Sequence, residues 1–137
     1  FPPRPYLPLG TLKKALVFPG TPSRTDGELK HLMDQCAIGY LFEKLYTEAD
    51  WTHVLSVGEQ QRLAFVRALI YKPVWLFLDE ASSALDENTE AAVYLLIKEQ
   101  CRETTMVSVG HRSTLDKYHE KILFLDKDKH TLEEVKR

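Results

Sequence analysis

The feature that most constrains the fold is a run of five apolar residues, Val74 to Leu78, followed at once by the carboxylates Asp79 and Glu80. The run does not alternate with polar residues, which is typical of a strand buried on both faces in a parallel sheet. Burying two adjacent carboxylates is costly unless each has a partner or a function. Asp79 and Glu80 are therefore candidate functional residues, although such a pair can equally cap the helix that follows.

A helix is expected just before this strand, over residues 58–71. Four apolar residues recur there at helical spacing, namely Leu63, Val66, Leu69 and Ile70. Ser56 is placed to cap the start of the helix, and Pro73 prevents it from continuing beyond Tyr71.

The rest of the chain divides into shorter elements. A second long helix is predicted over 88–102, with an apolar stripe at Ala92, Leu95 and Leu96. The remaining expectations are an ambiguous apolar stretch at 12–18, a loop at 19–27, a helix capped by Thr25 or Asp26 that runs to about residue 37, a short helix at 41–45, strands at 104–109, 122–125 and 131–135, and a turn at 127–129.

The order of these elements indicates the fold class. Strand, helix, strand, short helix and strand predict a three-layer α/β domain with right-handed crossovers. In such sheets, ligands bind at the carboxyl ends of the strands. Asp79 and Glu80 follow one strand and His111 follows another, so we expect these side chains on the same rim of the sheet.

Two segments have chemistry suited to a phosphate. Ser56 and Gly58 open a helix, where a hydroxyl and free backbone N–H groups form an anion site, although an ordinary N-cap explains the same residues. His111 can donate a hydrogen bond to a phosphate oxygen, although a structural hydrogen bond is the commoner role of a single histidine. The other histidines have no ligand spacing and are expected to be surface or packing residues; they are His31, His53, His119 and His130.

Composition argues against several classes of function. The net charge of −2 gives no global positive field, so no nucleic-acid partner is expected. No apolar run approaches the ~20 residues that a membrane span needs. Cys36 and Cys101 lack metal-type spacing and are expected to be reduced cytosolic thiols, with a disulfide as the alternative. The chain begins at Phe1 and its first methionine is Met33, so we expect it to be part of a longer protein.

Taken in order, four motifs resemble those of the ATP-binding-cassette (ABC) ATPase family. LSVGEQ at 55–60 is similar to the signature motif, and WLFLDE at 75–80 to the Walker B motif. SALD at 83–86 is similar to the D-loop, and Gly110-His111 to the switch histidine. The resemblance covers nearly the whole chain. It implies a P-loop NTPase-like three-layer sheet with a helical subdomain, incomplete because the N-terminal part with the phosphate loop is missing.

The resemblance implies roles for the residues on the predicted rim. Glu80 would be the general base that polarises the attacking water, and His111 would contact the γ-phosphate and help to fix Glu80. Asp79 would hold Mg²⁺ through water, so ATP and Mg²⁺ are the implied cofactors. The implied parts of the chain are a Q-loop region at 1–20, a helical subdomain with the signature motif at 21–72, and a catalytic core with Walker B, D-loop and switch histidine at 73–137.

The resemblance also implies a second ABC ATPase domain as partner. In the family, the signature helix points its N-terminus at the γ-phosphate held by the other domain, and here Ser56, Gly58 and Glu59 occupy those positions. Asp86 would reach across the dimer toward the partner's phosphate loop. Val57 stands where the family most often has glycine, which restricts the backbone. Glu59 stands where glutamine is common and adds negative charge near a phosphate, but both variants occur in the resembled subfamily.

Two departures from the family pattern bear on activity. Pro3 stands where the Q-loop glutamine usually precedes Arg-Pro-Tyr, and proline has no side chain able to ligate Mg²⁺. Two explanations stay open: the glutamine is truly absent from the protein, or Pro3 is an artefact of the end of a fragment. The phosphate-loop motif G-x-x-x-x-G-K-[ST] does not occur. Because that loop supplies the N–H cradle and the lysine, we expect the chain alone neither to bind ATP tightly nor to hydrolyse it.

A finer similarity lies near the two ends. RPYLPLGTL at 4–12 and VGHRS at 109–113 look like the peroxisomal fatty-acyl transporters and their bacterial relatives. This implies an ATPase segment of a membrane transporter, with transmembrane domains in the same parent polypeptide, at the cytoplasmic face of a bacterial inner or organelle membrane. Two alternatives stay open: a soluble ABC ATPase without a transport role, and a degenerate module that lends only its signature face to a complete partner.

Overall fold

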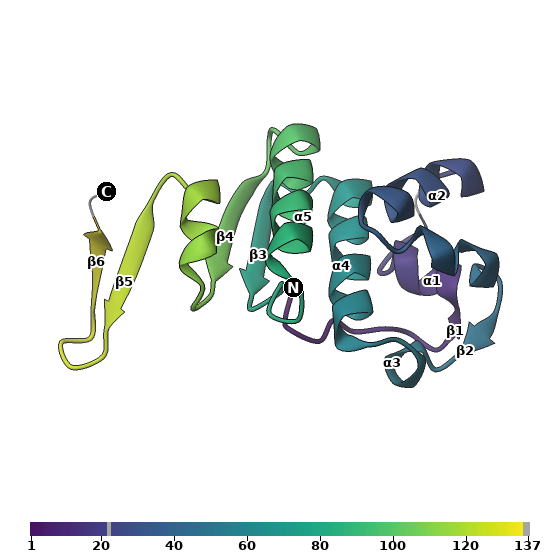
Figure 1. The fold of residues 1–137 in the computed structure, drawn as a ribbon, viewed down its shortest axis with the longest axis horizontal. Coiled ribbons are helices and arrows are strands. Elements are labelled where there is room, and N and C mark those ends of the chain that lie inside the picture. Colours follow the sequence, from purple (N-terminus) through teal and green to yellow (C-terminus); the bar gives the residue numbers. More distant parts are fainter. Residues whose placement is uncertain (22, 136–137) are drawn as a thin grey trace.

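The computed structural model describes residues 1–21 and 23–135, arranged as an elongated row of helices and short strands (Figure 1). Residue 22, in the predicted loop at 19–27, lies outside the described residues. The helices are α1 (Leu12–Val17), α2 (Asp26–Gln35), η1 (Gly39–Lys44), α3 (Trp51–Val54), α4 (Val57–Tyr71), α5 (Glu87–Gln100) and η2 (Ser113–Tyr118). The strands are β1 (Gly10–Thr11), β2 (Glu48–Ala49), β3 (Trp75–Asp79), β4 (Thr105–Val109), β5 (Ile122–Asp126) and β6 (Thr131–Val135).

Helix α4 is the centre of the molecule. It is buried around most of its circumference, as expected of a helix that is apolar on nearly every side. Helices α1, α2 and α5 pack against it. Ser56 caps its first turn, and Lys72 adopts a left-handed conformation (φ 43°) that ends the helix before Pro73. The predicted helix at 58–71, its cap and its apolar stripe are confirmed.

Strands β3 and β4 form a parallel pair connected through α5. The register runs from Trp75 opposite Thr105 to Asp79 opposite Val109. Because the strands are parallel, their carboxyl ends meet at one edge. The α/β fold class and the predicted shared rim are thereby confirmed. Within the described residues the other strands form two separate antiparallel pairs, β1–β2 and β5–β6, rather than extending this sheet.

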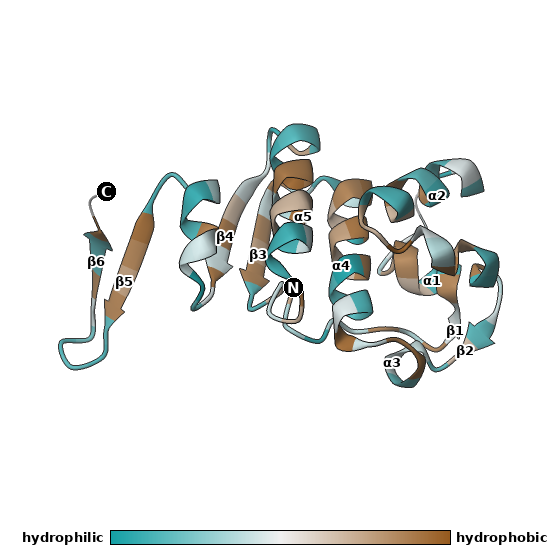
Figure 2. Ribbon diagram, in the orientation of Figure 1, coloured by the Kyte–Doolittle hydropathy of each residue, from teal (hydrophilic) through white to brown (hydrophobic). Residues whose placement is uncertain are grey.

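The prediction that β3 is buried on both faces is wrong for the described residues. Leu76 and Leu78 are buried, whereas Trp75 and Phe77 are 58% and 60% exposed. The strand alternates because its inward face packs into the core, while no described element covers the outward face. Several apolar residues of β3 and of the β5–β6 hairpin are exposed, among them Trp75, Phe77 and Phe124. Figure 2 colours β3 and β5 as mostly apolar.

The buried face of α5 also differs from the prediction. Ala92 and Leu95 are exposed and Leu96 is only partly buried. The buried residues are instead Glu90, Val93, Tyr94 and Ile97. Aromatic packing orients the helix: the Tyr94 ring lies 5.7 Å from that of Phe65 in α4 and stacks 5.1 Å from that of Tyr118 in η2. The three predicted residues are thereby turned away from the core.

The helices before α4 form a small cluster at one end of the molecule (Figure 1). The ambiguous stretch at 12–18 is the helix α1, and the helix predicted to run to residue 37 ends at Gln35. Thr25 caps α2 in a capping box with Glu28. The buried Trp51 donates from Nε1 to the carbonyl of Gly10 at 2.9 Å, which ties α3 to β1.

Both cysteines, Cys36 and Cys101, are free and buried. Burial raises the pKa of the Cys36 thiol to about 12, so little of it is ionised at neutral pH. Across residues 1–21 and 23–135, none of the helices combines the length and the hydropathy needed to cross a membrane.

Candidate functional site

The two predicted catalytic residues meet at the carboxyl edge of the β3–β4 pair. Glu80 follows β3 and donates its backbone N–H to the carbonyl of Val109 at 2.9 Å. His111 Nε2 lies 3.2 Å from Glu80 Oε1. The His111 side chain is 94% exposed and that of Glu80 is 30% exposed, so an incoming ligand could reach both.

The backbone of Glu80 is unusual. Its φ of 49° is in the left-handed region, which L-residues other than Gly, Asn and Asp seldom adopt. Such strain persists only where surrounding contacts hold it, and it is frequent at active sites. Here the backbone N–H of Glu80 is bonded to the carbonyl of Val109, and the Glu80 carboxylate lies beside His111.

Asp79 is the last residue of β3 and is exposed. Among the described residues, no group of three or more His, Cys, Asp or Glu side chains is arranged to hold a metal ion. Mg²⁺ in nucleotide sites is held by one or two carboxylates together with waters and substrate phosphates. Asp79 with the adjacent Glu80 fits that kind of site, and does not fit an all-protein cage.

The predicted anion site at the start of α4 is built around a capping box. Ser56 Oγ accepts the N–H of Glu59 at 3.1 Å, and Glu59 Oε1 accepts the N–H of Ser56 at 2.9 Å. The other Glu59 oxygen accepts the hydroxyl of Tyr40 at 2.5 Å. Burial favours the neutral acid, but the bonds from Tyr40 and Ser56 outweigh it and hold the pKa of Glu59 below its usual value. Glu59 is therefore an ionised, locally anchored carboxylate.

Gly58 is where the D-loop touches the signature helix. A Cβ on Gly58 would lie 3.3 Å from the carbonyl oxygen of Ala84 and 3.9 Å from Leu85 Cδ2. The close approach explains the need for glycine. The structure thus brings the signature motif and the D-loop side by side.

Asp86 caps helix α5. Its carboxylate accepts the N–H of Thr89 at 2.9 Å and the Thr89 hydroxyl at 2.8 Å. These bonds hold the pKa of Asp86 below its usual value. The side chain thus has a local structural role in this chain, and its role toward a second domain stays a prediction.

Gln61 is a functional candidate that sequence reasoning missed. Its side chain is fully buried, and Nε2 donates to the carbonyl of Pro3 at 2.9 Å and to Ser83 Oγ at 3.1 Å. Its Oε1 accepts the N–H of Ala84 at 2.9 Å. Gln61 therefore joins the first residues of the chain, the signature helix and the D-loop. In the sequence, Gln61 was recognisable only as a polar residue two positions before Leu63, where the apolar stripe of α4 begins.

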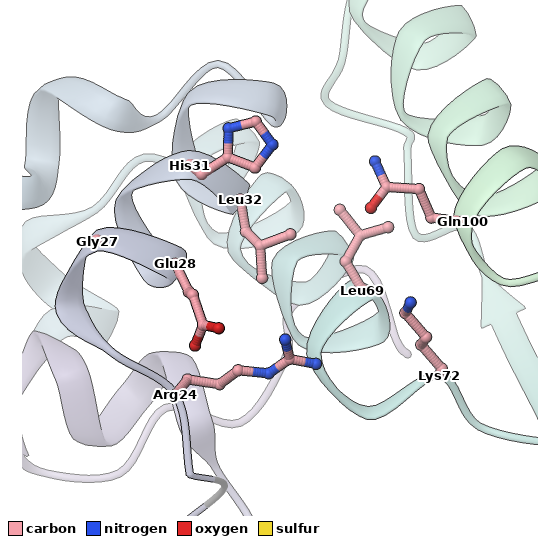
Figure 3. Close-up of a pocket in the computed structure, with 8 residues that line it drawn as sticks. All are labelled: Arg24, Gly27, Glu28, His31, Leu32, Leu69, Lys72 and Gln100. Atoms are coloured by element: carbon pink, nitrogen blue, oxygen red, sulfur yellow. The ribbon is translucent and has the colours of Figure 1, made fainter.

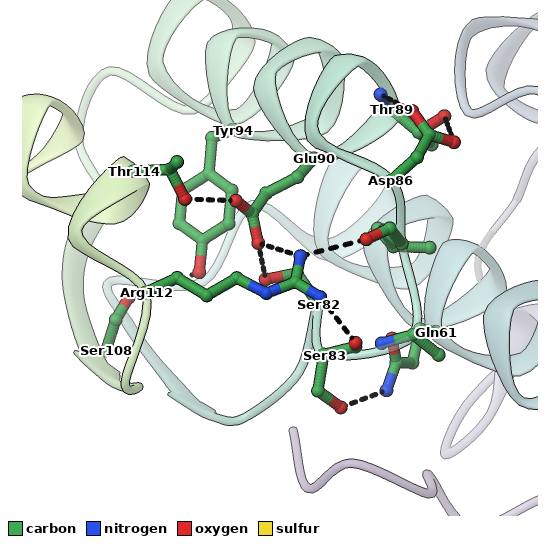
Figure 4. A network of polar contacts seen from close by, with 12 residues as sticks. Gln61, Ser82, Ser83, Asp86, Thr89, Glu90, Tyr94, Ser108, Arg112 and Thr114 are labelled. Carbon is green, nitrogen blue, oxygen red and sulfur yellow. Dashed lines mark hydrogen bonds and ion pairs between the residues drawn. The ribbon is translucent and has the colours of Figure 1, made fainter.

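A second missed group surrounds Glu90, a carboxylate that is 1% exposed (Figure 4). Ser82 Oγ and Thr114 Oγ1 each donate to it at 2.7 Å, and Arg112 Nη1 lies 3.4 Å away. These donors come from the segment after β3 and from the segment after β4. In the sequence, Glu90 is a glutamate outside the predicted apolar stripe of α5, so it was expected to be exposed rather than buried.

The cavities help to locate the site. A shallow hollow of about 590 Å³ is lined by residues of the D-loop and of the segment after β4, including Asp86, His111 and Arg112. A separate hollow of about 420 Å³ lies between α2 and the C-terminal ends of α4 and α5, where Arg24 and Lys72 are among its lining residues (Figure 3). The second hollow contains none of the predicted site residues, whereas the first contains Asp86 and His111 but neither Asp79 nor Glu80.

The fold and the site together define an ATP-binding-cassette domain. The family model described as ABC transporter matches residues 9–83, which is more than half of the chain. The chain belongs to this family.

Two relatives of known sequence bear on the expected similarity to the peroxisomal transporters and their bacterial relatives. An uncharacterized ABC transporter ATP-binding protein of Haemophilus influenzae is 49% identical over 125 residues, covering 91% of this chain and 21% of the relative. The human ATP-binding cassette sub-family D member 3 is 35% identical over 136 residues, covering 91% and 20%. The chain therefore spans about a fifth of the length of these relatives. The expected resemblance to bacterial proteins and to this subfamily is confirmed.

A solved structure shows the same fold. The structure described as a bacterial Atm1-family ABC exporter with ATP bound matches with a TM-score of 0.77 at 28% identity. The match covers 91% of this chain and 23% of the exporter chain.

Proposed function

We propose that this chain is the C-terminal part of the ATPase domain of an ABC-type membrane transporter, whose ATP hydrolysis drives substrate translocation. The observation that carries the proposal is the Glu80–His111 pair, 3.2 Å apart at the edge where β3 and β4 both end. Family membership supports ATP as the nucleotide. Members of the sub-family D and the exporter of known structure support a transport role.

In the proposed reaction, Glu80 accepts a proton from the water that attacks the γ-phosphate. His111 lies against the Glu80 carboxylate and presents its exposed ring edge to the phosphate. With a proton on both ring nitrogens, it donates to Glu80 from Nε2 and to the phosphate from the other nitrogen, which stabilises the developing charge. Mg²⁺, when bound through Asp79 and water, would neutralise charge on the phosphates. The hydrolytic groups thus come from the ends of two neighbouring strands.

The proposed partner surface is the start of α4. Ser56, Gly58 and Glu59 would face the γ-phosphate held by a second ABC ATPase domain, and Asp86 would approach the same partner. The N–H of Glu59 is taken by Ser56, whereas the backbone N–H groups of Val57 and Gly58 lack carbonyl partners within the helix and can bind an anion. Transmembrane domains and a place at the cytoplasmic face of a membrane belong to the same proposal.

Fractionation of source cells with an antibody to this chain tests the transporter assignment. The proposal predicts a membrane-bound band much larger than 15.8 kDa, and ATP hydrolysis by the protein purified from it. A large soluble ATPase would favour the soluble ABC alternative. A soluble band near 15.8 kDa without ATPase activity would favour a module that lends only its signature face.

A further inference from the structure

The carboxylate of Glu90 joins three segments of the chain although it belongs to none of the recognised motifs. It accepts hydrogen bonds from Ser82 after β3 and from Thr114 in η2, both at 2.7 Å. It also pairs with the Arg112 guanidinium at 3.4 Å. A carboxylate that is 1% exposed must be compensated in this way, because an unpaired buried charge is strongly destabilising.

Arg112 carries the connection onward to the D-loop. Its Nη1 donates to the carbonyl of Leu85 at 2.9 Å, and its Nη2 donates to the carbonyl of Ser83 at 2.8 Å. The guanidinium therefore bridges the Glu90 carboxylate and two backbone carbonyls, as Figure 4 shows. A planar fork of donors suits this arrangement, and a lysine ammonium could not reproduce it.

This network fixes the segment that contains His111. Arg112 is the next residue in the chain, and Thr114 lies three residues beyond His111. The His111 side chain is itself almost wholly exposed, and its contact with Glu80 is the one polar contact recorded for it within the described residues. Its position therefore depends on how firmly the following residues are held.

We infer that Glu90 is a positioning residue for the proposed hydrolysis: through Arg112 and Thr114 it holds His111 opposite Glu80, and it locks the D-loop to the same segment. The inference rests on the proposed function. It predicts that the effect of Glu90 on the rate passes through His111.

The test uses the purified full-length protein and its ATPase kinetics. Glu90→Gln should lower kcat by roughly tenfold or more and leave KM for ATP within about twofold, because a small misplacement of a reacting group mainly affects the chemical step. Glu99→Gln is the matched control, since it makes the same change at an exposed position of the same helix, and it should leave kcat unchanged. Arg112→Lys should reproduce the Glu90→Gln pattern.

The decisive comparison repeats Glu90→Gln in a His111→Ala background under single-turnover conditions. If Glu90 acts through His111, the further loss of rate there is below about twofold. An equal loss in both backgrounds would mean a general structural role and would overturn the inference while leaving the proposed function intact. A wild-type protein with no ATPase activity at all would overturn both.

Discussion

At the scale of single residues, the site depends on carboxylates whose charge is set by short local bonds. Glu59 is the clearest case, because hydrogen bonds from Tyr40 and from the Ser56 backbone overcome its burial and lower its pKa. Glu80 differs, since its position is set by a left-handed backbone turn and by His111. The Glu59 carboxylate is held by hydrogen bonds before any ligand arrives, and the Glu80 carboxylate lies 3.2 Å from His111 Nε2.

The lowered pKa of Glu59 makes a prediction about pH. The pKa of Glu59 in the folded state lies below the ordinary value of 4.5. The ionised carboxylate therefore stabilises the fold fully above pH 4.5, and this stabilisation is lost as the pH falls through the folded-state pKa. Glu59→Gln keeps a capping box but removes the charge. The stability difference between wild type and Glu59→Gln should therefore be largest near neutral pH and vanish in acid.

Urea unfolding of the chain at a series of pH values measures this difference. A background with Trp75→Ser and Phe77→Ser removes exposed apolar side chains of β3 and favours a monomer. Glu43→Gln, at an exposed position, is a suitable control and should show no such trend. A difference that grows on acidification would contradict the account of Glu59.

At the scale of elements, the central helix α4 connects the two ends of the molecule. One face packs against α1 and α2, and another packs against α5. Its polar contacts are concentrated in the first turns, where Gln61 bonds to Pro3, Ser83 and Ala84. Gln61 therefore connects the signature helix directly to the D-loop.

Replacing Gln61 by methionine tests this connection. The change keeps the length of the side chain but removes all three hydrogen bonds, which should cost about 1 kcal/mol locally because the D-loop partners are reached by water. Amide hydrogen exchange over residues 83–86 of the full-length protein should accelerate about fivefold. Gln35→Met is the control, because the Gln35 side-chain oxygen is buried without a hydrogen-bond partner among the described residues. Equal exchange in the two variants would argue against the connection.

The elements also show what the sequence can and cannot predict. The bounds of α4 were predictable because its apolar spacing, the Ser56 cap and Pro73 all agree. The shared rim followed from two parallel strands that are each followed by a polar residue, Glu80 after β3 and His111 shortly after β4. The network around Glu90 was not predictable, because its donors Arg112 and Thr114 lie 22 and 24 residues away in sequence. The exposed face of β3 was missed because an apolar run does not indicate what covers it.

At the scale of the whole molecule, the described chain has one well-packed region and a long apolar surface. The core extends from α1 through α4 to α5, whereas the outward face of β3 and both faces of the β5–β6 hairpin carry exposed large apolar residues. Figure 2 colours β3 and β5 as mostly apolar. Examples are Trp75, Phe77 and Phe124, each close to 60% exposed. Exposed apolar residues on strands promote association through strand edges and apolar faces.

The isolated chain of residues 1–137 should therefore self-associate. Sedimentation velocity should show species larger than the 15.8 kDa monomer, and Trp75→Ser with Phe77→Ser should shift the distribution toward the monomer. The same pair of changes at Tyr40 and Tyr46, which are exposed on other elements, should have a smaller effect. A clean monomer of the unmodified chain with a sharp cooperative melt would contradict this description of the surface.

We propose Glu80, which lies beside His111 after the end of β3, as the base for ATP hydrolysis. The most direct measurement is the steady-state and single-turnover ATPase rate of the full-length protein with Glu80→Gln, alongside nucleotide binding by the same variant. The account predicts a loss of hydrolysis of at least about 10²-fold, within the range that general base catalysis contributes, while ATP binding is retained. Hydrolysis at the wild-type rate by Glu80→Gln would contradict it.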